Sequence, residues 1–212
     1  MQPSPPVAAL EPLLADARQL GFLGPGPVHD QTARSLAFAA LAGPPPAGLA
    51  VDLGSGGGLP GLVLALVWPG SEWLLIDSNI RRATWLQTAI DELGIASRAR
   101  ALCERAELTG RGRWRQTAEL VTARGFGPPA PTAECAAGLL KLGGRLLVAD
   151  PPGQHGERWP RDGLATLGLR LETSKVVATE AGPVSLSQLR TASDCGSRYP
   201  RRVGVPFKRP LF

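Results

Sequence analysis

A glycine-rich segment is the part of the sequence best suited to chemistry. Gly54, Gly56, Gly58 and Gly61 follow a short apolar run, and Asp52 stands two residues before the first of these glycines. A strand that turns through glycines into a helix lets a ligand approach the backbone closely at the carboxyl end of the strand. The segment therefore predicts a nucleoside ligand, although a glycine loop can also be a purely structural turn.

Asp77 and Asp52 indicate which nucleoside ligand to expect. Asp77 ends the next apolar run, where a carboxylate can accept hydrogen bonds from both ribose hydroxyls. The glycines also match the dinucleotide pattern G-x-G-x-x-G, which is weak evidence when it stands alone. The negative charge of Asp52 would oppose a pyrophosphate but favour the ammonium and sulfonium groups of S-adenosylmethionine. We therefore favour S-adenosylmethionine over NAD.

The elements that must position these residues alternate along the chain. Short apolar runs and longer amphipathic stretches follow one another from residue 49, which is typical of an α/β protein with a doubly wound parallel sheet. We predict strands at Leu49–Leu53, Trp73–Ile76, Ala99–Cys103, Leu120–Thr122 and Arg145–Ala149. We predict helices near Leu62–Val67, Ile80–Leu93 and Thr132–Leu142, with Gly143 and Gly144 ending the last of them and closing strands at Leu164–Ala178 and Ser185–Thr191.

The N-terminal region is expected to form a helical cover. Leucines at helical spacing from Leu10 to Leu20 predict a helix that stops at Gly21. Asp30 can cap a second helix that contains Leu36.

Composition excludes several classes of protein. The sequence has no stretch near the roughly 18 uncharged apolar residues of a membrane span, so we expect a soluble, cytoplasmic protein. Cys103, Cys135 and Cys195 are odd in number and far apart, which argues against a disulfide framework or a zinc site. The two histidines, His29 and His155, are interpreted as solvated loop residues, and we expect no metal.

The positive charge is concentrated at the C-terminus. The formal net charge is +5. The residues after Ser197 include no acid and five cations, namely Arg198, Arg201, Arg202, Lys208 and Arg209. We predict that this basic tail pairs with RNA phosphates and can be removed without loss of donor binding, the alternative being a merely solubilising tail.

Five motifs, in order, resemble those of the bacterial small-subunit rRNA guanine-N7 methyltransferases, the RsmG or GidB family. They are Asp52-Leu53-Gly54-Ser55-Gly56-Gly57-Gly58-Leu59-Pro60-Gly61, then Leu75-Ile76-Asp77-Ser78 with Arg81-Arg82, Arg105-Ala106-Glu107, Ala123-Arg124-Gly125-Phe126, and Tyr199-Pro200-Arg201-Arg202 continuing to Leu211. The family's N-terminal His-x-x-Asp-Ser-Leu helix start is displaced here, so the resemblance does not extend to that cover.

The resemblance implies a class I S-adenosylmethionine-dependent methyltransferase fold, Rossmann-like, acting on N7 of a guanine in 16S rRNA. Its substrate would be 16S rRNA or a precursor of the small ribosomal subunit, with no membrane partner. It also implies donor contacts from Gly54, Leu59, Ala106, Glu107 and Arg124, to which the ribose argument adds Asp77. Structural alternatives are helix packing for Leu59, an exposed surface acid for Glu107 and a solvated strand-end charge for Arg124.

We accordingly divide the chain into a helical cover (1–46), a methyltransferase domain (47–192) and a basic tail (193–212). No side chain near the motifs is a convincing general base. Two rival functions stay open: a methyltransferase of the same fold that acts on a small molecule or protein, and a catalytically silent RNA-binding relative.

Asp150-Pro151-Pro152-Gly153 resembles a loop of amino-directed methyltransferases, but it follows the fifth strand instead of the fourth, so we interpret it as a strand exit.

Overall fold

The computed structural model describes residues 5–153 and 156–212, so His155 lies outside the described residues. Its strands are β1 (Leu49–Leu53), β2 (Glu72–Asp77), β3 (Ala99–Cys103), β4 (Ala118–Ala123), β5 (Leu140–Ala149), β6 (Leu169–Val177) and β7 (Val184–Thr191). Its helices are α1 (Pro5–Ala8), α2 (Glu11–Gln19), α3 (Val28–Ala42), α4 (Gly61–Val67), α5 (Ile80–Glu92), α6 (Ala106–Thr109), α7 (Pro129–Leu139), α8 (Arg161–Thr166) and α9 (Val205–Lys208).

The strands form one sheet in the order β3-β2-β1-β4-β5-β7-β6. The first five strands are parallel, as the alternating pattern predicts. By contrast, β7 runs antiparallel to both β5 and β6. Six residues join β6 to β7, and such a short connection permits only an antiparallel pair. The order reverses between β1 and β4, which is where open α/β sheets bind their ligands.

Two predicted boundaries in the second half of the chain are wrong. The helix expected at Thr132–Leu142 ends at Leu139, and Gly143 and Gly144 lie within β5. The register advances from Ala118 opposite Leu140 to Leu120 opposite Arg145, so the glycines occupy a bulge in the β4–β5 pair. The run expected as one strand at Leu164–Ala178 contains the end of α8 and then β6.

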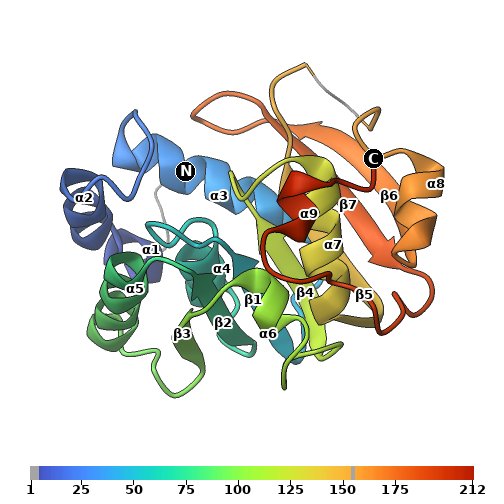
Figure 1. The fold of residues 1–212 in the computed structure, drawn as a ribbon. Helices are drawn as coiled ribbons and strands as arrows, with labels where there is room; N and C mark the ends of the chain where they lie inside the picture. The colour runs from blue at the N-terminus through green and yellow to red at the C-terminus, as the bar shows by residue number, and fades with distance from the viewer. Residues whose placement is uncertain (1–4, 154–155) are drawn as a thin grey trace.

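Helices cover both faces of the sheet (Figure 1). On one face α2 to α5 bury a core that includes Trp73, Leu75, Leu120 and Leu147. On the other face α7, α8 and the C-terminal segment bury the alternate strand residues, among them Leu74 and Val121. Alternate side chains of a strand point to opposite faces, so the continuous apolar runs follow from burial on both sides.

The N-terminal cover consists of two main helices, as predicted, preceded by the short α1. α2 ends at Gln19, two residues before Gly21, and its Leu14 and Ala17 are buried, as is its N-cap residue Leu10. Asp30 does not cap α3, because the helix begins at Val28 and places Asp30 inside its first turn.

None of the helices in the described part of the chain is long and apolar enough to cross a membrane. The described residues also contain no group of three or more His, Cys, Asp or Glu side chains suited to a metal ion.

Candidate functional site

The glycine loop follows β1 and lies against the segment that leaves β4. Gly54 has φ of +64°, a conformation that residues with a side chain rarely adopt. A Cβ at this position would also lie 2.8 Å from Cδ2 of Phe126. Only glycine therefore permits this turn, which brings the ends of β1 and β4 together.

Asp52 lies beneath the loop and points away from solvent. Its side chain is 1% exposed, with Oδ2 accepting from the Gly61 amide at 3.3 Å and Oδ1 accepting from Thr122 Oγ1 at 2.6 Å. Burial raises the pKa of Asp52 to about 6, although hydrogen bonds from Thr122, Ser55 and Gly61 oppose the shift. The start of α4, where a dinucleotide would place its pyrophosphate, is therefore already occupied by a carboxylate.

Asp77 connects the end of β2 to the glycine loop. Its Oδ2 accepts from the Gly56 amide at 3.0 Å and its Oδ1 accepts from the Asn79 amide at 2.8 Å. The Arg82 guanidinium lies 3.9 Å from Oδ2. These contacts fix the orientation of the carboxylate at the edge of a cavity.

Four of the six predicted donor contacts line one cavity. It has a volume of about 290 Å³ at the carboxyl ends of β1 to β4, and Gly54, Asp77, Ala106 and Glu107 all border it. We refer to it as the donor cavity. Glu107 is 3% exposed, so the alternative of an exposed surface acid is wrong.

Leu59 and Arg124 do not border the donor cavity. Both line an adjoining cavity of about 430 Å³ on the other side of the glycine loop. Leu59 also packs in the core, as its structural alternative proposed. The Arg124 guanidinium donates to Ser35 Oγ at 3.3 Å and also to Gln31 on α3. Burial lowers the pKa of Arg124, as does the nearby charge of Arg34.

The C-terminal segment is not a free tail, because it packs across the donor cavity. The Gly204 amide donates to Glu107 Oε1 at 2.9 Å. Phe207 borders the cavity, and its ring makes an edge contact with Phe126 at 5.7 Å between centroids. The expectation that the segment is separable from the donor site is therefore contradicted by these contacts.

Arg201 also departs from its expected role as an RNA contact. Its guanidinium bonds both carboxylate oxygens of Glu134, with Nη2 to Oε2 at 2.6 Å, and Glu134 is fully buried. The Arg201 amide donates to the same carboxylate at 2.7 Å. A side chain that neutralises a buried acid is structural.

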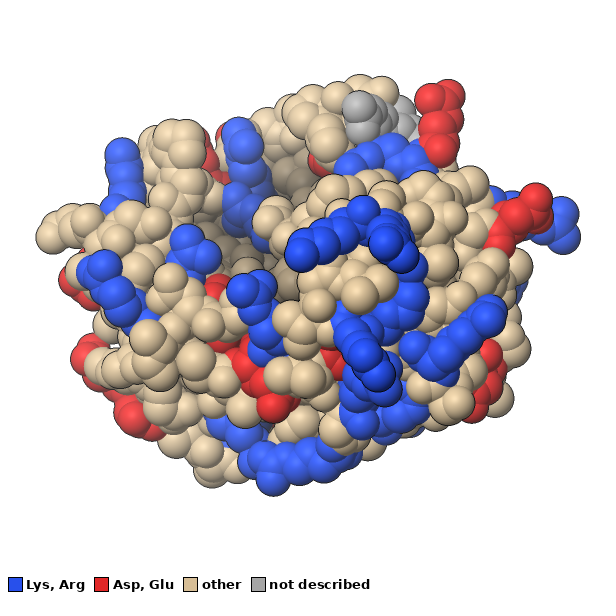
Figure 2. Space-filling view, viewed as in Figure 1, with Lys and Arg blue, Asp and Glu red and all other residues tan. Residues whose placement is uncertain are grey.

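The other predicted cations lie on the surface. Arg198, Arg202, Lys208 and Arg209 are exposed. Lys and Arg side chains gather over the C-terminal segment and around the hollow in the centre of the same face (Figure 2). The positive surface thus adjoins the cavities.

Sequence reasoning missed Phe207 as a wall of the donor cavity and missed Gln31 and Arg34 at its neighbour. Phe207 lies within the C-terminal signature, which we interpreted through its charges alone. Gln31 and Arg34 belong to the cover, where no motif marked them. Phe207 is identified only by its contact with Phe126, and Gln31 and Arg34 only by their position beside Arg124.

Comparison with known proteins agrees with this geometry. The family model described as rRNA small subunit methyltransferase G matches residues 38–157. Ribosomal RNA small subunit methyltransferase G of a Synechococcus species is 36% identical over 165 residues, covering 76% of this chain and 70% of the relative. The protein of that name from a Thermotoga species is 36% identical over 166 residues, covering 77% and 72%.

Solved structures support the fold. A SAM-dependent methyltransferase from Aquifex aeolicus superimposes with a TM-score of 0.59 at 13% identity, covering 84% of this chain and 98% of that one. The chain thus has the Rossmann-like fold of class I methyltransferases. With more than half of its length matched by the family model and relatives above 30% identity, the chain belongs to the rRNA small subunit methyltransferase G family.

Proposed function

We propose that the protein transfers a methyl group from S-adenosylmethionine to N7 of a guanine in 16S rRNA. The observation that carries this proposal is the donor cavity, which Gly54, Asp77 and Glu107 border, in a chain that belongs to an rRNA methyltransferase family. The substrate would be 16S rRNA or a small-subunit precursor, and the site of action the cytoplasm.

The chemistry of the donor cavity suits a cationic nucleoside. Its rim includes the carboxylates of Asp77, Glu104 and Glu107, and Asp52 lies just beneath the loop. Acidic groups stabilise the ammonium and sulfonium charges of S-adenosylmethionine and repel a pyrophosphate. Leu59 and Arg124 would reach the methionine end of the donor from the adjoining cavity.

When bound, S-adenosylmethionine would supply a methyl group on a positively charged sulfur. Guanine N7 has a free lone pair, so the N–C bond can form as the S–C bond breaks, and no proton has to leave. The residues of the chain therefore need only orient the two partners in line and exclude water.

Mapping of 7-methylguanine in 16S rRNA tests the proposal. Cells without the gene are expected to lack one 7-methylguanine that the gene restores, and purified protein with labelled donor should methylate small subunits from those cells. Donor binding without any transfer would indicate the silent RNA-binding relative. A methyl group on guanine N1 or on an exocyclic amine would refute the N7 assignment.

The pH dependence of single turnovers tests the absence of a base. With both substrates saturating, the rate should be nearly flat between about pH 6 and 9, because no essential proton transfer titrates in that range. A rate that rises tenfold per pH unit would require a general base and exclude this mechanism.

A further inference from the structure

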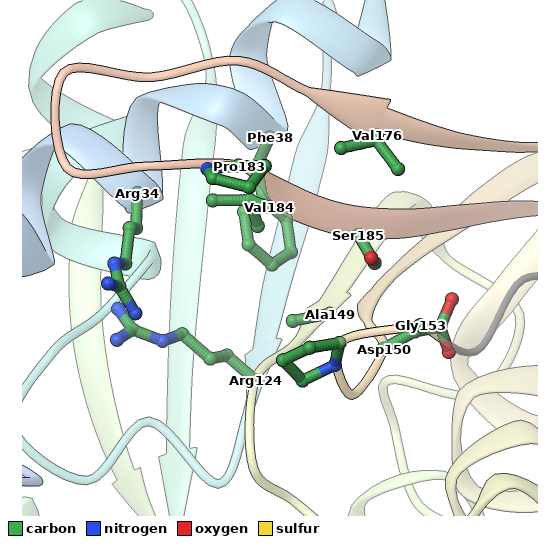
Figure 3. A pocket seen from close by; sticks show the side chains of 11 residues that line it. Arg34, Phe38, Arg124, Ala149, Asp150, Gly153, Val176, Pro183, Val184 and Ser185 are labelled. Carbon is green, nitrogen blue, oxygen red and sulfur yellow. The ribbon is translucent and has the colours of Figure 1, made fainter.

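A separate cavity lies beside the donor site, between α3 and the β6–β7 hairpin. Its volume is about 280 Å³, and it opens where β4 and β5 end (Figure 3). None of the six residues predicted to contact the donor borders it except Arg124. We refer to it as the acceptor cavity.

The walls of the acceptor cavity are apolar, while its two ends are polar. Phe38, Val176, Pro183 and Val184 border its middle. Arg34 and Arg124 lie at one end, and Asp150 and Ser185 lie toward the other (Figure 3). Apolar walls with few convergent polar groups are typical of sites for small flat ligands. A nucleobase, with apolar faces and polar edges, has this distribution.

The arginine end carries two positive charges, of which the charge of Arg124 also interacts with the buried Asp52. Arg34 Nη2 donates to the Ala181 carbonyl at 3.0 Å, and Arg124 bonds to Gln31 and Ser35. Among the described residues, no ion pair within 4.0 Å involves either arginine. Two adjacent guanidinium groups that are paired only with neutral partners favour a ligand with acceptor atoms or an anion.

The opposite end is bordered by Ser185 and by the strand exit at Asp150, Pro152 and Gly153. The Asp150 carboxylate is not free to bind a ligand there, because its side chain is 0% exposed and accepts from Arg158 Nη1 at 3.2 Å and from the Ser187 hydroxyl. The Asp150-Pro151-Pro152 strand exit therefore shapes this end of the cavity.

Arg124 shows how the acceptor cavity lies relative to the donor. It borders both the acceptor cavity and the cavity beside the glycine loop, so the donor lies at the arginine end. Guanine has acceptors N7 and O6 along one edge and the donors N1–H and N2–H₂ along another. Adenine instead presents an amine where guanine has O6. With N7 directed to the donor, O6 of guanine can accept from Arg124, whereas the adenine amine cannot.

We propose, on the basis of the proposed function, that the acceptor cavity receives the target guanosine nucleotide of single-stranded rRNA. N7 faces the donor, O6 faces Arg124, the N1 and N2 edge points to the Ser185 end, and Arg34 binds a phosphate at the mouth.

Filling the cavity gives the first test. Val176 is 53% exposed and lines the cavity, so Val176→Trp should block it without disturbing the core. We expect methylation of small subunits to fall at least tenfold while calorimetry shows unchanged binding of S-adenosylhomocysteine. The control is Leu142→Trp, at the opposite end of the sheet and 70% exposed, which should methylate normally. If Val176→Trp methylates small subunits as fast as the Leu142→Trp control, the proposal is refuted.

Removing one charge gives the second test. Arg34→Gln should raise the KM for the RNA substrate about tenfold, as expected for loss of a charged hydrogen bond, and leave the Kd for S-adenosylhomocysteine within twofold. Arg18→Gln, at an exposed position of α2, is the control. A weakened Kd for S-adenosylhomocysteine would assign Arg34 to the donor carboxylate, and an unchanged KM would exclude the phosphate contact; either result overturns its role.

Methylation of rRNA by the wild-type protein distinguishes failure of the proposed function from failure of the acceptor-cavity assignment. If it methylates no rRNA, the proposed function fails. If it methylates guanine N7 and both Val176→Trp and Arg34→Gln behave like wild type, the proposed function stands and the assignment of the acceptor cavity fails.

Discussion

At the scale of single residues, Asp52 shows how burial changes a role assigned from charge. The sequence suggested a direct effect on the ligand, whereas the carboxylate lies under the glycine loop, bonded to Gly61 and Thr122. It can therefore act on the donor only through space. Because burial raises its pKa to about 6, that action depends on pH near neutrality.

Donor binding should follow the charge of Asp52. Below its pKa the side chain is neutral, so affinity for S-adenosylmethionine should rise about tenfold from pH 5 to 7 and then level off. A bound cationic donor opposes this upward shift and lowers the pKa, so binding near pH 6 releases a proton. Calorimetry at several pH values checks this. Asp52→Asn should remove the rise, and S-adenosylhomocysteine, which lacks the sulfonium charge, should show a smaller one. Identical profiles for wild type and Asp52→Asn would contradict the assignment.

At the scale of elements, the C-terminal segment packs closely against two glycines, where any side chain would clash with it. A Cβ on Gly138 would lie 2.3 Å from Cδ of Pro200, and one on Gly163 would lie 2.3 Å from Cδ1 of Phe212. Together with the Arg201–Glu134 pair, these contacts fix where α9 crosses the donor cavity.

Arg201→Ala should destabilise the protein far more than Arg202→Ala. The first leaves the fully buried Glu134 without its counter-charge, which costs about 3 kcal/mol. The second removes an exposed cation, with an expected change within about 0.5 kcal/mol. Urea unfolding measures both. Similar midpoints for the two variants would show that the Glu134 pair contributes little.

Phe207→Ala should weaken donor binding. The variant removes one wall of the donor cavity and the edge contact with Phe126, so the Kd for S-adenosylhomocysteine should rise about three- to tenfold. Phe212→Ala, which loses a contact with Gly163 away from the cavity, is the matched control. If calorimetry gives one Kd for wild type and both variants, Phe207 is not part of the donor site.

At the scale of the whole molecule, the basic surface adjoins the mouths of the cavities (Figure 2). Arg198, Arg202, Lys208 and Arg209 are exposed, whereas Arg201 is committed to Glu134. The same segment thus faces RNA on one side and the donor on the other. Its removal would affect both ligands.

The salt dependence of RNA binding measures how many of these cations pair with phosphates. Four contacts predict a slope of log affinity against log salt of about −2.8 for single-stranded RNA, and five would give about −3.5. Replacing the four exposed cations together should flatten the slope by about 2.8 and preserve binding of S-adenosylhomocysteine. A slope unaffected by the four substitutions would place the RNA elsewhere.

The sequence by itself determined the fold class, the parallel strands and the residues that end them. Those features are local: a glycine turn, an apolar run and an acid at a strand end depend on neighbours in the chain. The resemblance to the family assigned Gly54, Ala106 and Glu107 through short motifs, the ribose argument added Asp77, and all four border one cavity.

Only the tertiary structure decided what depends on contacts between distant segments. Arg201 is structural because Glu134 is buried beneath it, and Phe207 reaches the donor cavity because Gly204 bonds to Glu107. Arg34 lies beside Arg124 because α3 packs against β6 and β7 and its Ser35 accepts from the Arg124 guanidinium. A side chain's charge is fixed by its type, but whether that charge faces RNA, a ligand or a buried acid depends on which segments lie against it.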